Sequence, residues 1–108
     1  MKEFNKIIEI DDFKISFNFS KDSIKFLKNH EHILLVETVY ELIVKGVKKL
    51  NGITINIDII ELHGNLKGYY RILIGNIGII FQYIKGEIHI ENIESISFRG
   101  DVYKKKFL

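Results

Sequence analysis

The residues best suited to chemistry in this chain are its two arginines, Arg71 and Arg99, because fourteen of the sixteen basic residues are lysines. A guanidinium presents five donors in a planar fork and can grip a phosphate with two hydrogen bonds at once, which a lysine ammonium cannot do. Both arginines lie in stretches typical of strands and strand ends, GYYRILIGN and SFRGDVYK. They are therefore the first candidates for a phosphate-binding site.

Composition narrows the class of protein. The chain has 108 residues, which is enough for one domain with a single core, and we expect residues 1–11 to form a short N-terminal extension. It has no cysteine, so neither disulfides nor a cysteine metal site can form, which fits the reducing cytoplasm. No signal peptide or membrane-spanning stretch is recognisable. The four histidines lack ligand spacing beyond His30 and His32, so no metal or cofactor is expected.

Hydrophobic periodicity predicts the elements that must position the arginines. Residues 13–19 alternate apolar and polar side chains, the period of a half-buried strand, whereas Met1 to Ile10 give no clear signal. Ser20 is a suitable N-cap for a short amphipathic helix that carries Ile24 and Leu27 on one face.

A second, longer helix is predicted from Leu35 to Leu50, where apolar residues recur at spacings of three, four and seven. Asn51-Gly52 would end this helix through a left-handed cap. Residues 53–66 are ambiguous. We expect the two helices to form a hairpin packed on one face of a sheet.

The C-terminal half reads as a three-stranded antiparallel meander. Two-residue turns at Gly75-Asn76 and Lys85-Gly86 would join strands over 69–74, 77–84 and 87–96. The whole is then an α+β two-layer domain, with an N-terminal strand and a helical hairpin packed on an antiparallel sheet.

Alternation along these strands separates two faces. One face is apolar throughout and must meet the core; it carries Tyr70, Ile72, Ile74, Ile77, Ile79 and Phe81. The other face carries Tyr69, Arg71, Leu73, Gly78, Ile80 and Gln82. A two-residue second turn would place His89 and Glu91 on that second face too, either as solvated residues or as a polar cluster with Arg71 over a phosphate. Leu73, Ile80 and Tyr69 would give that face exposed apolar surface on which a partner could bind.

The segment LHGNLKGYYRILIGN, followed by IIFQY and then by FRGDVYK, resembles the RelE/ParE superfamily of toxins from bacterial and archaeal toxin–antitoxin pairs. The usual pattern there is a leucine and a glycine before "yRlRvGdyRiiy", then "hRkdvY" near the C-terminus. The similarity is detailed from Leu62 to Lys104, and upstream it extends to the order of strand and helices.

This resemblance implies a small cytoplasmic toxin that a cognate antitoxin wraps and neutralises. RelE-like members cut mRNA in the ribosomal A site, whereas ParE-like members poison DNA gyrase. Carried over by position, Arg71 stands where a basic residue contacts the scissile region, Arg99 matches the arginine after the last strand, and Tyr103 matches the tyrosine that stacks or assists proton transfer.

Two cations of the pattern are missing here. The second arginine of "RlR" is Leu73, and the "yR" that opens the next strand is Ile77-Gly78. The turn at Gly75-Asn76 makes Leu73 and Gly78 cross-strand neighbours, so both cations are lost from one spot. Lysines are the available substitutes for binding RNA, and the candidates are Lys67, Lys104, Lys105 and Lys106.

Simpler roles for the same residues stay open. Arg71 could pair with Glu91, Arg99 could pair with Asp101, and Tyr103 could anchor the C-terminal segment. Glu61 is a weak general-base candidate, and His63 reads as a loop residue. Three functions follow from the resemblance: a RelE-like ribosome-dependent mRNA endoribonuclease or a weakened descendant of one, a ParE-like inhibitor of gyrase, or a non-toxic member that binds an antitoxin.

Overall fold

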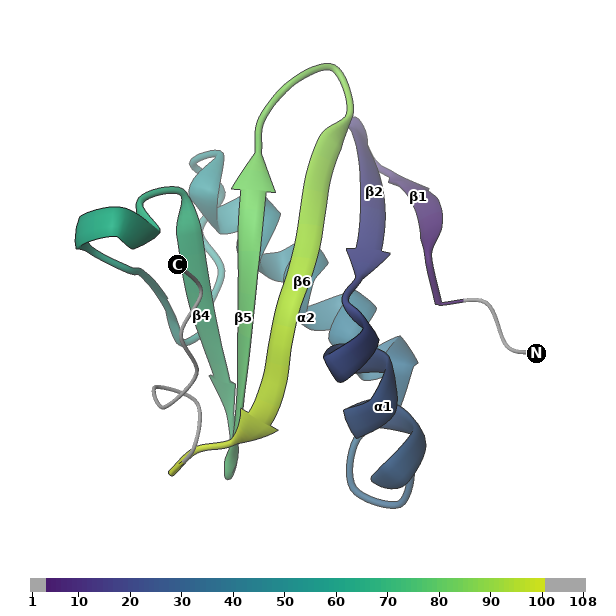
Figure 1. The fold of residues 1–108 in the computed structure, drawn as a ribbon. Coiled ribbons are helices and arrows are strands. Elements are labelled where there is room, and N and C mark those ends of the chain that lie inside the picture. The colour runs from purple at the N-terminus through teal and green to yellow at the C-terminus, as the bar shows by residue number, and fades with distance from the viewer. Residues whose placement is uncertain (1–3, 101–108) are drawn as a thin grey trace.

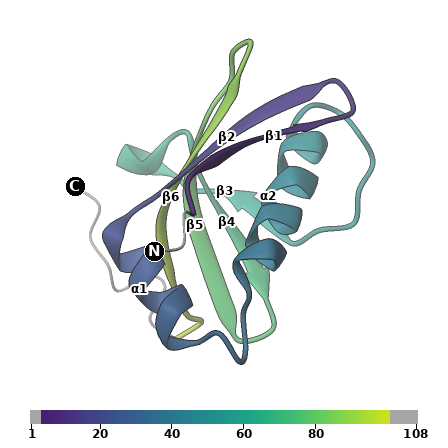
Figure 2. The same cartoon turned by 90° about the vertical axis from the view of Figure 1, so that its right-hand side faces the viewer.

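The fold is built on one six-stranded sheet. The computed structural model describes residues 4–100 of the chain. The strand order across the sheet is β1-β2-β6-β5-β4-β3. The helix α2 lies across one face, behind the strands in Figure 1 and to the right of the sheet in Figure 2. This is the α+β two-layer arrangement that the sequence predicts. Its elements are β1 (Lys6–Ile10), β2 (Phe13–Phe19), α1 (Lys21–Asn29), α2 (Val36–Leu50), β3 (Ile59–Glu61), the 3-10 helix η1 (Gly64–Leu66), β4 (Tyr69–Ile74), β5 (Ile77–Ile84) and β6 (His89–Phe98).

The sheet is antiparallel except between β2 and β6, which run parallel to each other. Periodicity alone cannot show this pairing, because it joins residues about 74 positions apart, such as Ile15 with His89. β1 pairs with β2 at one edge, in the N-terminal stretch to which the sequence assigned no structure. The ambiguous region from 53 to 66 contains the short opposite edge strand β3.

The helix α1 begins where the sequence predicts it, at the N-cap Ser20. The Ser20 hydroxyl accepts a hydrogen bond from the Ser23 amide at 3.1 Å and donates one to the Glu94 carbonyl at 2.8 Å. Glu94 is the extra residue of a β-bulge, since Phe81 pairs with Ile93 but Ile80 pairs with Ser95. The helix cap is thereby attached to the irregular point of β6.

The helix α2 supplies the other half of the core. It ends at Asn51, whose side-chain amide donates to the Val47 carbonyl, and Gly52 follows with φ of 92°, as the left-handed cap requires. Gly46 lies where the helix comes closest to the sheet, because a Cβ there would be 3.1 Å from Ile59 Cδ1. The main core cluster joins this helix, α1 and the strands; its largest fully buried members are Phe17, Phe81, Ile15, Leu27, Ile43, Ile72, Ile79 and Ile93.

The two hairpins of the meander differ from each other. Gly75-Asn76 forms the predicted two-residue turn, with Gly75 at φ 54° and Ile74 paired with Ile77. The predicted turn at Lys85-Gly86 is wrong, because Ile84 pairs with Ile90 and the connection is therefore five residues long. Gln82 consequently pairs with Asn92 instead of His89. This shift by an odd number of residues moves the side chains of β6 before the bulge to the opposite face, and the bulge at Glu94 restores the predicted parity from Ser95 onward.

Candidate functional site

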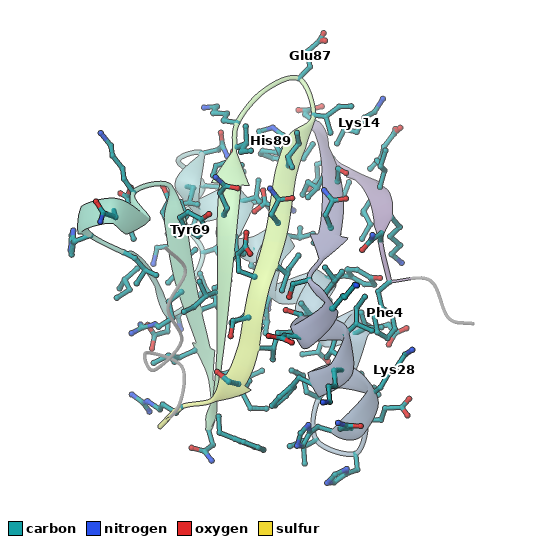
Figure 3. The ribbon with its side chains drawn as sticks, viewed as in Figure 1. Phe4, Lys14, Lys28, Tyr69, Glu87 and His89 are labelled. Carbon is teal, nitrogen blue, oxygen red and sulfur yellow. The ribbon has the colours of Figure 1, made fainter. Side chains whose placement is uncertain are left out.

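The face of the sheet opposite α2, called here the outer face, carries the candidate residues of β4 and β5. Figure 1 looks directly onto it, and Figure 3 shows Tyr69 on it in the same view. Its members on the four central strands include Tyr69, Arg71 and Leu73 of β4; Gly78, Ile80, Gln82 and Ile84 of β5; Ile90, Asn92, Ser95 and Ser97 of β6; and Lys14, Ser16 and Asn18 of β2. The predicted division of β4 and β5 into two faces is therefore confirmed.

Arg71 lies in the middle of β4 on the outer face, opposite Ile80 of β5 and Ile60 of the edge strand β3. Its Nη2 atom is 2.9 Å from Oδ1 of Asp58, and its side chain is only 11% exposed. The expected alternative ion pair between Arg71 and Glu91 is wrong, because the Glu91 side chain projects from the other face of the sheet. Asp58, just before β3, thus holds the guanidinium in place, and a phosphate would share or displace this contact.

Leu73 and Gly78 are directly opposed, as the predicted turn requires, and Ser97 follows Gly78 in the same cross-strand row. Leu73 is half-buried and Gly78 is buried. This row lies one step along the sheet from Arg71. No side chain in this row can carry a positive charge, so Arg71 is the cation that β4 and β5 contribute to the outer face.

The centre of the outer face is less exposed than the sequence suggests. Ile80 is 1% exposed and packs with Leu62 and Tyr69 in a second small cluster. The expectation that Ile80 offers apolar surface to a partner is therefore wrong. The cause lies in the loop after β3, which turns Leu62 onto this face. Exposed isoleucines are found instead on the flanking strands, at Ile7 and Ile60, and at Ile84 near the end of β5.

Three further candidate site residues lie in or next to the loop before β4. Lys67 is exposed, directly after η1 and two residues before Tyr69, so it can reach an anion at the edge of the outer face. Glu61 pairs with Tyr70, which puts it on the opposite parity from Arg71, and it accepts a hydrogen bond from the Gly68 amide at 3.4 Å. His63 is exposed in the loop, as expected. Of these three, Lys67 fits the site best.

Arg99 follows the last strand and is exposed. Its backbone amide donates to the Asn76 carbonyl at 2.7 Å, which fixes it beside the β4–β5 turn and so at the Leu73–Gly78 end of the sheet. Tyr103, Lys104 and Lys105 lie outside the described residues, as does Asp101. The assignments made for them stay predictions.

Glu91 and His89 do not join the outer face, so their predicted placement is wrong. β6 pairs in parallel with β2 such that both residues lie on the parity of Ile15 and Phe17, toward α2. Glu91 is fully buried, and neither of its carboxyl oxygens has a hydrogen-bond partner among residues 4–100. Burial raises the pKa of Glu91 to about 9, so this carboxyl is neutral at pH 7.

A small polar network surrounds this buried carboxyl. The Asn51 amide donates to the Tyr83 hydroxyl at 2.9 Å, and that hydroxyl shares a hydrogen bond of 2.6 Å with Nδ1 of His89. Burial and Lys85 lower the pKa of His89, and burial raises the pKa of Tyr83, so both are neutral near pH 7. The network links the end of α2 to β5 and β6 on the face of the sheet that α2 covers. Its hydrogen bonds therefore connect elements of the fold.

Sequence reasoning missed a row of amides on the outer face. Asn92 Nδ2 donates to Gln82 Oε1 at 3.0 Å, and Asn18 Nδ2 donates to Asn92 Oδ1 at 3.2 Å. The signal that could have revealed the row was Asn18 alternating with the phenylalanines of β2. Pairing it with Asn92 requires the parallel β2–β6 contact, which the sequence does not show.

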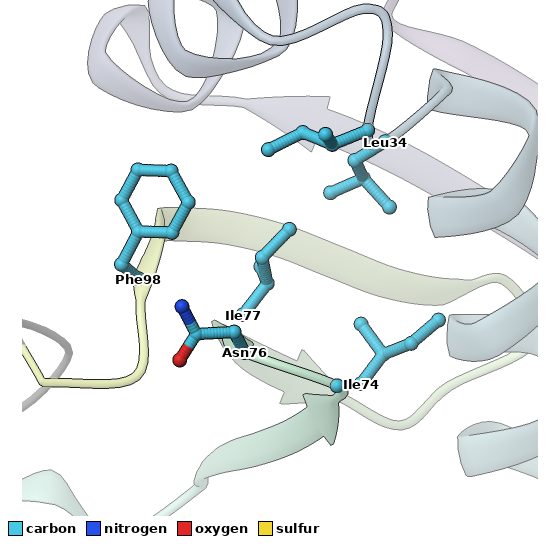
Figure 4. A pocket seen from close by; sticks show the side chains of 7 residues that line it. Leu34, Ile74, Asn76, Ile77 and Phe98 are labelled. Carbon is cyan, nitrogen blue, oxygen red and sulfur yellow. The ribbon is translucent and has the colours of Figure 1, made fainter.

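Two largely apolar cavities of the described part lie away from Arg71. One of about 390 Å³ sits between the α1–α2 connection and the β4–β5 hairpin, where Leu34, Ile74, Ile77 and Phe98 approach one another (Figure 4). Another of about 500 Å³ lies between β1 and α2, lined by Ile8, Ile10, Tyr40 and Val44 among others. Neither brings together groups for acid–base chemistry.

Residues 4–100 contain no group of three or more histidine, aspartate or glutamate side chains arranged to hold a metal ion. No helix among them is long and apolar enough to cross a membrane.

Comparison with solved structures identifies the fold. The RelB-RelE antitoxin-toxin complex from Methanococcus jannaschii contains a chain that is 27% identical, with a TM-score of 0.52, over 81% of this chain and 95% of that one. YafQ from E. coli gives 11% identity and a TM-score of 0.54, over 81% and 96% of the two chains. The YoeB/ParE toxin from Agrobacterium tumefaciens gives 14% and 0.55, over 76% and 95%.

These neighbours confirm the predicted resemblance at the level of the fold, which is that of RelE/ParE-like toxins. The two bacterial structures are too dissimilar in sequence to say more than that. No family model and no curated protein matches the chain.

Proposed function

We propose that this chain is the toxin of a type II toxin–antitoxin pair, and specifically a RelE-like, ribosome-dependent mRNA endoribonuclease or a weakened descendant of one. The observation that carries the proposal is Arg71, whose guanidinium lies on the outer face in an ion pair with Asp58, on a fold shared with the M. jannaschii toxin over 95% of that chain. We further propose that the protein acts in the cytoplasm, where mRNA is translated.

RNA cleavage by this route needs three contributions. The 2′-hydroxyl attacks the adjacent phosphorus and loses its proton, the crowded phosphate is stabilised, and the departing 5′-oxygen gains a proton. Arg71 is suited to the second contribution, because a guanidinium can bind two phosphate oxygens at once. Arg99 is the second candidate, exposed next to the β4–β5 turn.

The remaining roles follow from the resemblance and from charge. Tyr103 would stack on a base or assist proton transfer, as the matching tyrosine of the family does. Lys67, Lys104 and Lys105 would bind the RNA backbone, which attracts any exposed cation. None of these groups requires a metal or another cofactor.

Because Leu73 and Gly78 replace two arginines of the family pattern, we expect weak RNA cleavage. A donor aimed at the developing charge typically contributes ~10²–10³ in rate, and this row supplies none where the family pattern has arginines. The same absence favours the alternative functions, which are inhibition of DNA gyrase or antitoxin binding without toxicity. These functions need a protein-binding surface more than a cluster of positively charged side chains.

The deciding experiment compares two targets. Purified protein is added to an in vitro translation reaction, where cleavage of mRNA is mapped with and without ribosomes, and to a DNA gyrase supercoiling assay. Ribosome-dependent cleavage that is lost in Arg71→Ala supports the proposal. Inhibition of supercoiling without cleavage supports the gyrase alternative, and neither effect supports the non-toxic member.

The proposed partner is a cognate antitoxin encoded by a neighbouring reading frame. RelB accompanies RelE in the M. jannaschii structure, and here exposed isoleucines on the edge strands leave apolar surface for a bound segment. Co-expression with the adjacent frame should give a complex that survives gel filtration. Purification of the protein from its own host as a free monomer would contradict this assignment.

A further inference from the structure

We propose that the free edge of β1 and the groove beside it bind a second copy of this chain, so that two copies pair their β1 strands antiparallel in one continuous sheet. This inference goes beyond the proposed function and does not depend on it, because it concerns the edge strand β1, whereas Arg71 lies on β4. Within residues 4–100, β1 pairs with β2 on one side and has no strand on the other.

The two edges of the sheet differ in how open they are to a further strand. β3 has only three residues, and a short edge strand is one way in which proteins prevent edge pairing. β1 has five residues, Lys6–Ile10, and in Figure 2 the viewer faces this strand. Charged side chains can also block an edge, but both charges of β1 are engaged within their own copy. Lys6 Nζ lies 4.2 Å from the centre of the Tyr40 ring, and Glu9 Oε1 is 3.7 Å from Lys14 Nζ.

A groove lies between β1 and α2, on the side of the sheet where an added strand would direct half of its side chains. It is the cavity of about 500 Å³ described above, and its lining is largely apolar. Ile8 and Ile10 of β1 line it, and Ile10 is 38% exposed. Because side chains alternate along a strand, a strand paired with β1 would turn every second residue toward the same groove. The groove therefore fits the alternate apolar side chains of such a strand.

The sequence of β1 is compatible with pairing to itself. An antiparallel pair centred on Ile8 uses all five residues, keeps each on its own face and gives a twofold axis, as expected for identical chains. Ile8 then lies opposite Ile8 of the second copy, and Lys6 lies opposite Ile10. On the other face of the sheet, Ile7 lies opposite Glu9. No charge meets a like charge in this register, whereas a pair centred on Lys6 or on Glu9 would oppose two like charges directly.

The helix α2 follows β1 in the same direction along the groove. The Tyr40 hydroxyl donates to the Phe4 carbonyl just before β1. Further along the helix, Lys48 Nζ lies 2.6 Å from Oδ2 of Asp11, just after β1. An antiparallel pair of β1 strands therefore brings the two α2 helices toward each other in opposite directions, on the same face of the joined sheet.

The charges of α2 that line the groove are self-complementary in this arrangement. Glu41 lies in the first half of the helix, whereas Lys45 and Lys48 lie in the second half. When two such helices run in opposite directions, the acidic end of each meets the basic end of the other. Complementary charges of this kind fix the register and orientation of an interface. They favour a second copy of the chain over a partner of uniform charge.

Light scattering after gel filtration, at concentrations up to about 100 µM, measures the assembly. The natural protein should approach twice its mass of 12.7 kDa as the concentration rises. Two substitutions of Ile10 test the register, because this residue would face Lys6 of the second copy. Ile10→Lys opposes like charges at two symmetric places, and Ile10→Glu opposes unlike charges there. The dissociation constant of Ile10→Lys should therefore be about tenfold higher than that of Ile10→Glu.

A cross-link tests the contact itself. The chain has no cysteine, so Ile8→Cys introduces a single thiol. Residues directly opposed in an antiparallel pair have Cα atoms about 4.5–5.5 Å apart, a separation that a disulfide can span. Mild oxidation of Ile8→Cys should therefore give a covalent dimer, whereas Ile60→Cys on the opposite edge strand β3 should stay monomeric.

Ile60→Lys is the matched control for Ile10→Lys, because Ile60 is an isoleucine of the other edge strand and is 45% exposed. It should leave dimerisation unchanged, and thermal unfolding verifies that every variant is folded. A natural protein that stays monomeric over this concentration range would overturn the inference. So would a dimer that Ile60→Lys disrupts, equal dissociation constants for the two Ile10 variants, or no cross-link in Ile8→Cys. A monomer whose complex with an antitoxin is lost in Ile10→Lys would assign the β1 edge to that partner instead.

Discussion

Leu73 of β4 lies directly opposite Gly78 of β5, one pair away from the Gly75-Asn76 turn, on the outer face of the sheet. Backbone pairing on both strands fixes these two positions, so no rotamer change of a neighbour can return a guanidinium to this spot. Arg99 begins the segment after β6 near this turn, held by the bond from its amide to the Asn76 carbonyl.

Restoring the missing cations should raise activity. We expect Leu73→Arg with Gly78→Arg to increase ribosome-dependent mRNA cleavage by at least tenfold, on the order of the ~10²–10³ effect of one donor. Leu73→Arg alone should give a smaller gain, and it serves as the test if an arginine at the buried position 78 disturbs the fold. Cleavage is measured by primer extension on a translated mRNA.

The control for this gain is Ile84→Arg. Ile84 is 44% exposed, on the same face of the same strand as Gly78 but at its far end. It adds the same charge without placing it beside the hairpin, so it should leave cleavage nearly unchanged. Strong cleavage by the natural protein that the double substitution does not alter would place the chemistry elsewhere.

Because Arg71 and Asp58 form an ion pair, we expect substitutions of the two residues to have opposite effects on the interaction with RNA. Arg71→Lys should lower cleavage, because an ammonium cannot bind two phosphate oxygens as the fork does. Asp58→Asn removes a competing carboxylate, so RNA affinity should rise several-fold. Because Asp58 is 55% exposed, its loss should cost less than about 1 kcal/mol of stability. Anisotropy and urea unfolding measure the two effects, and weaker RNA binding by Asp58→Asn would count against the site.

Arg99 and Tyr103 are tested by growth. If expression of the protein slows growth, Arg99→Ala and Tyr103→Phe should each relieve the effect while the melting temperature stays the same. Arg99→Lys should restore only part of it, for the reason given for Arg71. Toxicity that persists unchanged in all three variants would remove both residues from the proposed site.

Stability should fall as pH rises, because of Glu91. The pKa of this carboxyl is raised in the folded protein from an ordinary 4.5 to about 9, so folding favours its protonated form. Its contribution is fully present below about pH 4.5 and is lost progressively as pH rises toward 9, at up to ~1.4 kcal/mol per pH unit. Glu91→Gln keeps the shape without the charge, so its unfolding free energy in urea should depend much less on pH over this range.

Glu87→Gln provides the comparison for Glu91→Gln. Glu87 is exposed at the tip of the β5–β6 connection (Figure 3), so removing its charge should leave the pH dependence as it is. Equal pH slopes in the natural protein and in Glu91→Gln would mean that the carboxyl is ionised in the folded state, in contact with water or a cation.

The sequence by itself determined the local elements and the faces of two strands. Ser20, Asn51-Gly52 and Gly75-Asn76 each act through backbone preferences of a few adjacent residues, and all three end or begin elements where predicted. Alternation along β4 and β5 was enough to separate Arg71 from the core, because a side chain's face follows from its parity alone.

Only the tertiary structure decided what meets across the sheet. Lys85-Gly86 predicts a two-residue turn between β5 and β6, but five residues separate the paired Ile84 and Ile90, and this length sets the parity of Glu91 and His89. The parallel contact of β2 with β6 brings Asn18 to Asn92, and the loop before β3 brings Asp58 to Arg71. Such contacts between distant residues depend on the packing of the whole chain, which short-range preferences do not encode.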